Sequence, residues 1–359
     1  MQNSMVWENL RAVFSVQSEC NEIEQTKNDK HELHNMVPTL VVGDMHAKEE
    51  AILKRVDVAI EKLGISEVVF LGDYFDEWHA SDKLMLQAIN ELEHWVRTKR
   101  EQGVTLQFLL GNHDMSYLRH EVGAGTHQNL FTEVCSTLEF LEVKIAAVMG
   151  SYLLTHAGVT NAWARKFLGN TLNTNFKEAP QHSCISPEII ASELNAMLKS
   201  GSKDKLDALY TAGAERGGFG LPGPLWAGKQ ELSKDAIYGL NQIVGHTPVP
   251  TISSATITAK DEDKKALNGL SKFKNRVSTQ LNIQHKHEIA SESKHNSNTN
   301  EKLFFCDTFS LTSNMYAIGD GSMLLINGNE TSILTSESLD LDDWELAAIN
   351  WSNGHIVHL

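Results

Sequence analysis

Apolar and polar residues recur in a regular pattern through the first third of the chain. Three short apolar runs, at residues 39–42, 67–71 and 104–110, have the length of buried strands. The two segments between them, 48–63 and 82–100, repeat apolar residues at helical spacing and carry charges on the opposite face. Strands that alternate with helices predict a parallel sheet with crossover helices, and therefore an α/β fold.

A second group of strands is expected further along the chain. Apolar runs at 141–148 and 151–155 predict two strands joined by a tight turn, and another strand is expected within 237–244. Residues 161–209 are mostly of helical type, with an Asn- and Thr-rich break at 170–175. Helices should therefore separate the strands of this group as well.

Shorter apolar runs return near the end of the chain, at 302–306, 315–318 and 323–327. We expect three more strands here, with Gly319-Asp320-Gly321 as a hairpin turn. The tail that follows is expected to form a final helix and strand.

Two polar regions depart from this pattern. Residues 1–36 are mixed and polar, and we expect them to form a helical lead-in. From about 253 to 301 the chain is rich in Lys, Ser, Asn and His with little apolar periodicity, which predicts a polar, flexible surface insertion. Its histidines are interpreted as part of a solvated loop rather than as metal ligands. We therefore predict one domain, over residues 37–359, that carries the 253–301 insertion.

Composition narrows the classes of function. The 359 residues are 41% hydrophobic, which is enough for a substantial core. The net charge of −15, from 31 basic and 46 acidic residues, opposes non-specific binding to nucleic acid and to anionic membranes. The four cysteines form no Cys-x-x-Cys pair, so a disulfide framework or a zinc ribbon is not expected. With no signal peptide or apolar run of about 18 residues visible, we expect a cytoplasmic protein without a membrane partner.

Five short polar motifs follow apolar runs, and each contains Asp, Asn or His. In chain order they are Gly43-Asp44-Met45-His46, Gly72-Asp73-Tyr74-Phe75-Asp76, Gly111-Asn112-His113-Asp114, Thr155-His156-Ala157-Gly158 and Gly245-His246-Thr247. Asp, Asn and His are ligands that divalent metals prefer, and ligand-binding residues gather where strands leave the carboxyl edge of an α/β sheet. One such motif alone would most often be a turn or a structural histidine. Five in order predict a hydrolytic centre with two metals.

The spacing within the motifs indicates how the side chains divide their tasks. Asp44 and His46 lie two residues apart, so an extended backbone directs both to the same ion. Asp73 can bridge two ions with its two carboxylate oxygens. Asn112 supplies a neutral oxygen ligand, and the adjacent His113 points the other way and is free to act on a substrate.

Together these motifs resemble the calcineurin-like metallophosphoesterase superfamily, in the same order, from about residue 39 to 248. The resemblance implies a four-layer αββα sandwich in which two central mixed β-sheets are flanked by helices. It also implies that His113 is a general acid oriented by Asp76. The metal ligands that it implies are Asp44 and His46 for the first metal, Asp73 as the bridge, and Asn112, His156 and His246 for the second. Such a ligand set accepts two divalent ions such as Mn, Fe or Zn.

Two details are similar to the phosphoprotein phosphatase branch, in particular to its bacterial and phage members of the Shewanella-like type. Pro248 stands where phosphodiesterases and nucleases carry a second histidine, and Gly223-Pro224-Leu225-Trp226-Ala227 is similar to the Leu-Trp element of the branch, with Arg216 nearby. The strand that ends at Asp307-Thr308 also resembles the family. These details favour a phosphatase that acts on phosphorylated proteins.

Three residues depart from the family pattern. Ala47 stands where Gly is usual, which a right-handed backbone would accept, and Asp114 stands where protein phosphatases usually have Glu. Glu77 stands where these phosphatases place a phosphate-binding arginine, and a carboxylate cannot bind a phosphoryl oxygen. Either Arg216 or Arg119 replaces that arginine beside Asn112, or the substrate differs. We favour Arg216 because it lies in a glycine-flanked loop.

The expected activity is hydrolysis of phosphate monoesters, including phosphorylated Ser, Thr or Tyr of proteins, by a metal-bridging hydroxide with His113 as general acid. Asp114 and Glu77 keep open an alternative, a phosphodiesterase or a hydrolase of dinucleoside polyphosphates and nucleotides. Pro248 and the acidic composition oppose it. A remoter alternative is a metal-binding scaffold without activity, whose insertion binds a partner. The expected partner is a phosphorylated substrate rather than nucleic acid, and the pattern leaves the oligomeric state open.

Overall fold

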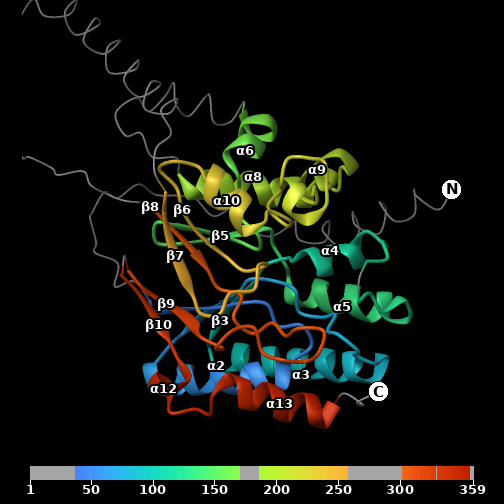
Figure 1. Ribbon diagram of the computed structural model, residues 1–359, viewed down its shortest axis with the longest axis vertical. Helices are drawn as coiled ribbons and strands as arrows, with labels where there is room; N and C mark the ends of the chain where they lie inside the picture. The colour runs from blue at the N-terminus through green and yellow to red at the C-terminus, as the bar shows by residue number, and fades with distance from the viewer. Residues whose placement is uncertain (1–36, 124, 170–185, 258–300, 329, 356–359) are drawn as a thin grey trace, which may run out of the picture.

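The structure is a computed structural model of the chain. It describes residues 37–123, 125–169, 186–257, 301–328 and 330–355. Within these residues, two five-stranded sheets pack face to face, and helices cover the outer face of each sheet (Figure 1). The expected four-layer αββα sandwich with two mixed sheets is confirmed.

The first sheet has the strand order β10-β9-β1-β2-β3. Its parallel part consists of β1 (Thr39–Val42), β2 (Glu67–Phe70) and β3 (Thr105–Phe108). The hairpin of β9 (Met323–Asn327) and β10 (Glu330–Leu334) adds two antiparallel strands at the β1 edge. The early strands of the pattern thus form the parallel centre that we predicted.

The second sheet has the order β4-β5-β6-β8-β7. Its central strands β5 (Tyr152–Thr155), β6 (Asn241–Val244) and β8 (Glu301–Phe305) run parallel. The edge strands β4 (Ala146–Met149) and β7 (Ser253–Ile257) pair antiparallel with their neighbours. A chain that crosses between two sheets in this way brings strand ends from distant parts of the sequence together.

The helices form the two outer layers and one side of the molecule (Figure 1). Next to the first sheet lie α2 (Glu49–Leu63), α3 (Asp82–Glu101), α12 (Ser336–Leu339) and α13 (Trp344–His355). Next to the second sheet lie α6 (Asn161–Phe167), α8 (Pro187–Lys199), α9 (Lys203–Leu209) and α10 (Lys229–Asp235). At the side lie α4 (Asn112–Leu118) and α5 (Phe131–Leu141). No helix in the described ranges is long and apolar enough to span a lipid bilayer.

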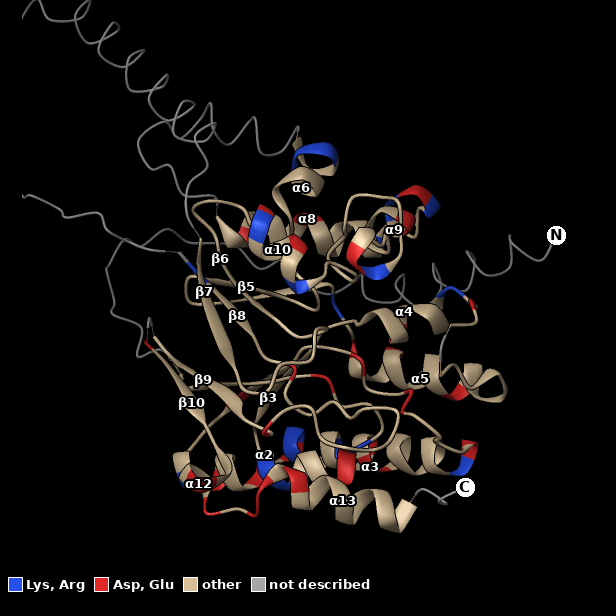
Figure 2. Ribbon diagram, viewed as in Figure 1, with Lys and Arg blue, Asp and Glu red and all other residues tan. Residues whose placement is uncertain are grey.

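Burial on both faces explains why the strands read as continuous apolar runs. In β1, Leu40 and Val42 pack with the helix-covered core, whereas Val41 packs between the two sheets with Leu154 and Ile243. Strands covered on both sides need apolar residues at every position, not at alternate ones. Most charged residues accordingly lie on the helices and on the loops that leave the strands (Figure 2). The loops at the strand ends are therefore where polar chemistry can be placed.

Some sequence-based boundaries were wrong. The polar insertion does not begin at 253, because Ser253–Ile257 forms β7 along β8. Its remainder, 258–300, lies outside the described residues, as do the lead-in 1–36 and the expected break at 170–175.

The expected strand at 315–318 is reduced to a single bridge between Leu311 and Ala317. Gly319-Asp320-Gly321 does not form the hairpin turn, which instead follows β9, at Gly328 with φ of +66°. Gly321 is required for packing, since a Cβ atom there would lie 2.6 Å from the Cβ of Trp344. The expected final strand falls on 356–359, outside the described residues.

Candidate metal centre

Hydrogen bonds from backbone amides join the loops after β1, β2, β5 and β6. The amide of Gly245 donates to the carbonyl of His156 at 2.8 Å. The amides of Met45 and His46 both donate to the carbonyl of Asp73, at 3.0 and 2.9 Å. The amide of His246 donates to the carboxylate of Asp44 at 3.0 Å, although 202 positions separate the two residues. The four motifs therefore meet at one edge of the two sheets.

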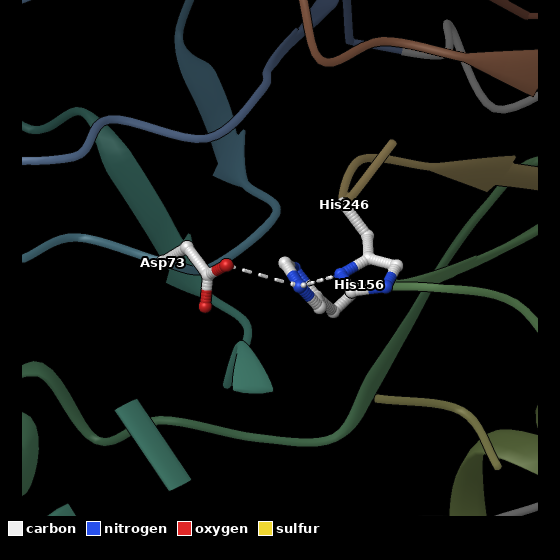
Figure 3. Close-up of side chains that lie close together, drawn as sticks. All are labelled: Asp73, His156 and His246. Atoms are coloured by element: carbon white, nitrogen blue, oxygen red, sulfur yellow. Dashed lines mark hydrogen bonds and ion pairs between the residues drawn. The ribbon is translucent and has the colours of Figure 1, made fainter. Parts of the chain in front are cut away.

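Two groups of ligand atoms share Asp73. Asp73, His156 and His246 place one ligand atom each within 4.8 Å of one another (Figure 3), and so do Asp44, His46 and Asp73. In the first group, His156 Nε2 lies 3.4 Å from Asp73 Oδ2 and 3.2 Å from His246 Nδ1. In the second, His46 Nε2 lies 3.9 Å from Asp73 Oδ2 and 4.0 Å from Asp44 Oδ2. A carboxylate between two groups has the geometry of a bridging ligand.

The contacts of Asn112 test whether these residues fit a cation. Its side-chain oxygen lies 2.9 Å from His156 Nε2, 2.8 Å from His246 Nδ1 and 3.2 Å from Asp73 Oδ2. With the oxygen in this place, acceptor atoms face one another, which suits a cation between them; with the amide turned over, its NH2 group would instead donate to all three atoms. Asp, Asn and His offer the donor atoms that a divalent cation prefers, and the amide oxygen of Asn112 can face such an ion. The residues therefore fit a metal site.

Left-handed backbone conformations give the motif loops their shape. His46, Asp73 and His246 have φ values of +46°, +52° and +63°. Such conformations are unfavourable for residues with a Cβ atom and concentrate at functional sites. Ala47 also has a positive φ, +56°, so the expectation of a right-handed backbone there was wrong. The amide of Ala47 donates to the carbonyl of Tyr74 at 2.8 Å, which holds it in this conformation.

The protonation of the ligands is set by burial and by neighbouring charges. Burial, aided by Asp307, holds the pKa of Asp44 well above its ordinary value. Burial also opposes ionisation of Asp73, but the imidazoles of His156 and His113 outweigh it and lower the pKa of Asp73. A bound cation would favour the charged form of both carboxylates. Of the two, Asp73 is the carboxylate that ionises readily without it.

The carboxylate of Asp114 accepts hydrogen bonds from the loops that carry Asp73 and Asn112. The sequence did not reveal this role. Its Oδ2 accepts from the amides of Asp73 at 2.8 Å and Gly111 at 2.9 Å, and its Oδ1 accepts from the amide of Tyr74 at 3.1 Å. Asp114 lies in the first turn of α4, three residues after the Gly111 cap. An acidic residue at this helical position was the available signal.

His113 lies beside the ligand groups but belongs to neither. Its Nδ1 is 3.1 Å from Asp76 Oδ2, and its ring meets that of His46 edge-on with 5.3 Å between centroids. Burial disfavours the imidazolium, but Asp73 and Asp76 outweigh it and raise the pKa of His113 to about 9. At neutral pH this imidazole is therefore a cation that can donate a proton.

A cavity of about 540 Å³ opens over this edge of the sheets. The residues from the predicted site that line it are His46, Asp73, Asp76, Asn112, His113, Arg216 and His246. Asp44 and His156 are completely buried behind it. Pro248, Leu311 and Ile318 supply apolar parts of the wall.

The two candidate arginines differ in position. Among the described residues, Arg216 is the one arginine or lysine that lines the cavity, and it donates to Thr247 Oγ1 at 2.7 Å and to the His246 carbonyl at 3.3 Å. Arg119 does not line the cavity, because Asp207 and Glu121 hold its guanidinium at 2.8 and 2.6 Å. Of the two, only Arg216 is placed to meet a substrate.

Glu77 is explained by a buried partner that sequence reasoning missed. Its carboxylate forms an ion pair with Lys48, which is completely buried and also donates to the carbonyl of His46 at 3.0 Å. Asp307, which the sequence analysis noted only as part of a family-like strand, is a buried carboxyl that lines the cavity and accepts from Ser310 Oγ at 2.8 Å. Burial raises the pKa of Asp307 to about 6. Lys48 lies only two positions after His46, but its pairing with Glu77 across 29 positions has no local signature.

Comparison with known proteins agrees with this geometry. The family model of the calcineurin-like phosphoesterases matches residues 37–250, which include all six predicted metal ligands. No curated protein sequence matches the chain significantly.

Two similar solved structures are a cold-active protein-tyrosine phosphatase of a Shewanella species and a metallophosphoesterase from Sphaerobacter thermophilus. The first is 13% identical with a TM-score of 0.43, over 89% of this chain and 86% of that one. The second is 11% identical with a TM-score of 0.37, over 89% of this chain and 99% of that one. At such low identity neither bears on the substrate. The match of the family model over more than half of the sequence shows that the chain belongs to the calcineurin-like phosphoesterase family.

Proposed function

We propose that this protein is a phosphatase that holds two divalent metal ions and hydrolyses phosphate monoesters. The observation that carries the proposal is the pair of ligand groups joined at Asp73, next to a cavity that also contains the His113–Asp76 pair. Asp44, His46 and Asp73 would hold one ion, and Asp73, Asn112, His156 and His246 the other. Mn, Fe and Zn all suit these ligands. When bound, the ions neutralise the phosphoryl charge and lower the pKa of a water molecule.

The residues of the chain supply proton transfer and orientation. Asp76 accepts the Nδ1 proton of His113 and leaves Nε2 as the donor to the oxygen of the leaving group. Arg216, held by Thr247 and by the carbonyl of His246, presents its charge to a phosphoryl oxygen in the cavity. These roles need a substrate with one phosphoryl group at the ligand residues and its leaving group beside His113.

The charge of the cavity favours a monoester over a dinucleoside polyphosphate. Besides Arg216 and the His113 imidazolium, which faces the leaving group, the charged groups on its described wall are carboxylates, Asp307 among them. Additional phosphates would face these carboxylates without a cation to bind them. Pro248 lines the cavity at the place where phosphodiesterases carry a second histidine. The absence of that histidine is a separate reason against a diesterase.

A phosphorylated protein side chain is the substrate that we propose. Trp226, from the Gly-Pro-Leu-Trp element that resembles protein phosphatases, lines the cavity and meets the ring of His246 edge-on at 5.6 Å between centroids. Trp78, half-exposed, also lines the cavity and offers a surface for a peptide.

The test compares an aryl phosphate monoester with the matching diester, each with Mn²⁺, Fe²⁺ or Zn²⁺ and with a chelator. We expect metal-dependent hydrolysis that favours the monoester, followed by release of phosphate from phosphopeptides. The Asp73→Asn variant, purified identically, controls for contaminating phosphatases. Preference for the diester would support the phosphodiesterase alternative, and no hydrolysis with any metal would support a scaffold.

A further inference from the structure

The carboxylate of Asp76 has a second partner besides His113. Its Oδ2 faces His113 Nδ1 at 3.1 Å, and its Oδ1 accepts a short hydrogen bond from the hydroxyl of Tyr117. Tyr117 and His113 both belong to α4 and are four residues apart, so their side chains lie on the same face of the helix. Both oxygens of a buried carboxylate are thereby engaged by two residues of one helix.

The hydroxyl of Tyr117 is itself fixed in place. It accepts from the amide of His127 at 2.9 Å, and its ring meets Phe131 edge-on with 5.2 Å between centroids. The side chain is completely buried. Burial and the charge of Asp76 raise the pKa of Tyr117, so the hydroxyl keeps its proton and acts toward Asp76 as a donor.

Orientation of Asp76 matters because a carboxylate can turn about its last side-chain bond. Asp76 lies in a loop with φ of +67°, outside regular secondary structure. A hydrogen bond to one oxygen restrains this rotation only partly, whereas bonds to both oxygens restrain it further. The direction of the His113 ring, and with it the direction of Nε2, depends on where Asp76 Oδ2 lies.

We propose that Tyr117 is a positioning residue for proton donation, which orients Asp76 and, through Asp76, the imidazole of His113. This inference rests on the proposed phosphatase function. In the reaction, the oxygen of water forms a bond to phosphorus while the ester P–O bond breaks and its electron pair goes to the leaving oxygen. That oxygen takes the proton of His113 Nε2, and the proton released by the attacking water restores the imidazolium. Tyr117 exchanges no proton in these steps.

The test uses the Tyr117→Phe variant and a series of aryl and alkyl phosphates. The leaving group of an ester of an acidic phenol, with a pKa of about 4, departs without protonation, whereas the leaving group of an alkyl ester must be protonated. We expect kcat of Tyr117→Phe to be nearly that of the wild type for the acidic phenols and to fall about 10- to 100-fold for the alkyl esters. KM should change little across the series.

Tyr74→Phe is the matched control. Tyr74 is also completely buried, and its hydroxyl donates to the Leu109 carbonyl at 2.7 Å, not to Asp76. Any loss in this variant should be the same factor for every ester. Adding Tyr117→Phe to Asp76→Asn should cause no further dependence on the leaving group, because the oriented carboxylate is already absent.

A second measurement does not depend on activity. In the metal-free protein, the Nδ1 proton of His113 should give a downfield NMR signal, identified by its loss in His113→Asn. We expect Tyr117→Phe to shift or broaden this signal and Tyr74→Phe to leave it unchanged. An unchanged signal together with a uniform loss of kcat in Tyr117→Phe would overturn the inference. Absence of hydrolysis by the wild type would instead overturn the proposed function, so the two failures are distinguishable.

Discussion

Two adjacent parts of the site satisfy their polar atoms in opposite ways. In the proposed metal cage, formed by Asp44, His46, Asp73, Asn112, His156 and His246, the side-chain oxygen of Asn112 faces acceptor atoms of Asp73 and two histidines. In the proton-donor network, formed by Tyr117, Asp76 and His113, each donor faces an acceptor. The cage thus offers acceptor atoms to a cation from outside the chain, whereas the network pairs its donors and acceptors without one. Changes in the two parts should have separable effects on metal content and on turnover.

The largest effect is expected for Asp73→Asn. Asp73 belongs to both ligand groups, and the amide removes the charge that would hold both ions. We expect bound metal to be lost and hydrolysis to fall by about 1000-fold or more, since metal ions contribute several kcal/mol of charge stabilisation. Elemental analysis and a monoester assay measure the two effects. A variant that keeps its metal and its rate would show that the cage is misassigned.

The next effect is expected for His113→Asn, in the proton-donor network. Turnover should fall by about 10²- to 10⁴-fold for poor leaving groups, the range for loss of a general acid or base. Metal content should stay at the wild-type level, because His113 belongs to neither ligand group. Equal loss of metal and of turnover would remove the distinction between the two parts.

The buried carboxyl of Glu49, outside both ligand groups, tests whether the interior of the protein tolerates a negative charge. Glu49 is completely buried in the first turn of α2, and neither side-chain oxygen bonds to another described residue. Burial raises its pKa from 4.5 to about 8. The folded state thus binds this proton more tightly than the unfolded state, and the resulting stability is complete below pH 4.5 and is lost as pH rises to about 8.

Glu49→Gln should remove this dependence. Between pH 4.5 and 8, the free energy of unfolding of the wild type should fall relative to the variant by on the order of 3–5 kcal/mol. Urea unfolding at pH 5 and pH 8.5 measures the difference, with Glu61→Gln on the exposed face of α2 as control. Parallel pH curves for the wild type and Glu49→Gln would contradict the buried, neutral state of Glu49.

A smaller effect is expected at the substrate side of the cage. Arg216→Gln should lower kcat/KM about 10- to 100-fold, since hydrogen bonds to charged groups contribute roughly 1.5–3 kcal/mol. Inhibition by inorganic phosphate should weaken in parallel. Arg119→Gln is the control, because Asp207 and Glu121 hold that arginine outside the cavity. The assignment would be reversed if Arg119→Gln lost more activity than Arg216→Gln.

The smallest effect concerns strain in the cage. Ala47→Gly should raise the free energy of unfolding by up to about 1 kcal/mol, because glycine accepts the φ of +56° without steric repulsion. The same substitution at Ala59, inside α2, should lower stability by about 1 kcal/mol. Thermal unfolding of both variants measures the signs. Destabilisation by both would show that the backbone at Ala47 is not strained.

Much of the fold followed from local signals. The strands β1, β2 and β3 and the helices α2 and α3 were predicted within a few residues, because each combines an apolar run with a helical or extended period. The stretch at 315–318 was misjudged because it is apolar yet forms only one bridge, in a loop. The strand β7 was not predicted because its first residues are polar. It lies at the edge of the sheet, where one side of the strand is exposed and needs no apolar residues.

The sequence by itself picked out the side chains of the proposed cage, because each stands within a few residues of the end of an apolar run, in a short motif of ligand-type residues. Only the tertiary structure decided that Lys48 neutralises Glu77, that Arg216 rather than Arg119 lines the cavity, and that Tyr117 bonds to Asp76. The first and third of these contacts join residues 29 and 41 positions apart. The two arginines differ only in which residues surround them in the folded chain. Periodicity and short motifs report on neighbours along the chain, whereas such contacts depend on how the sheets and loops pack.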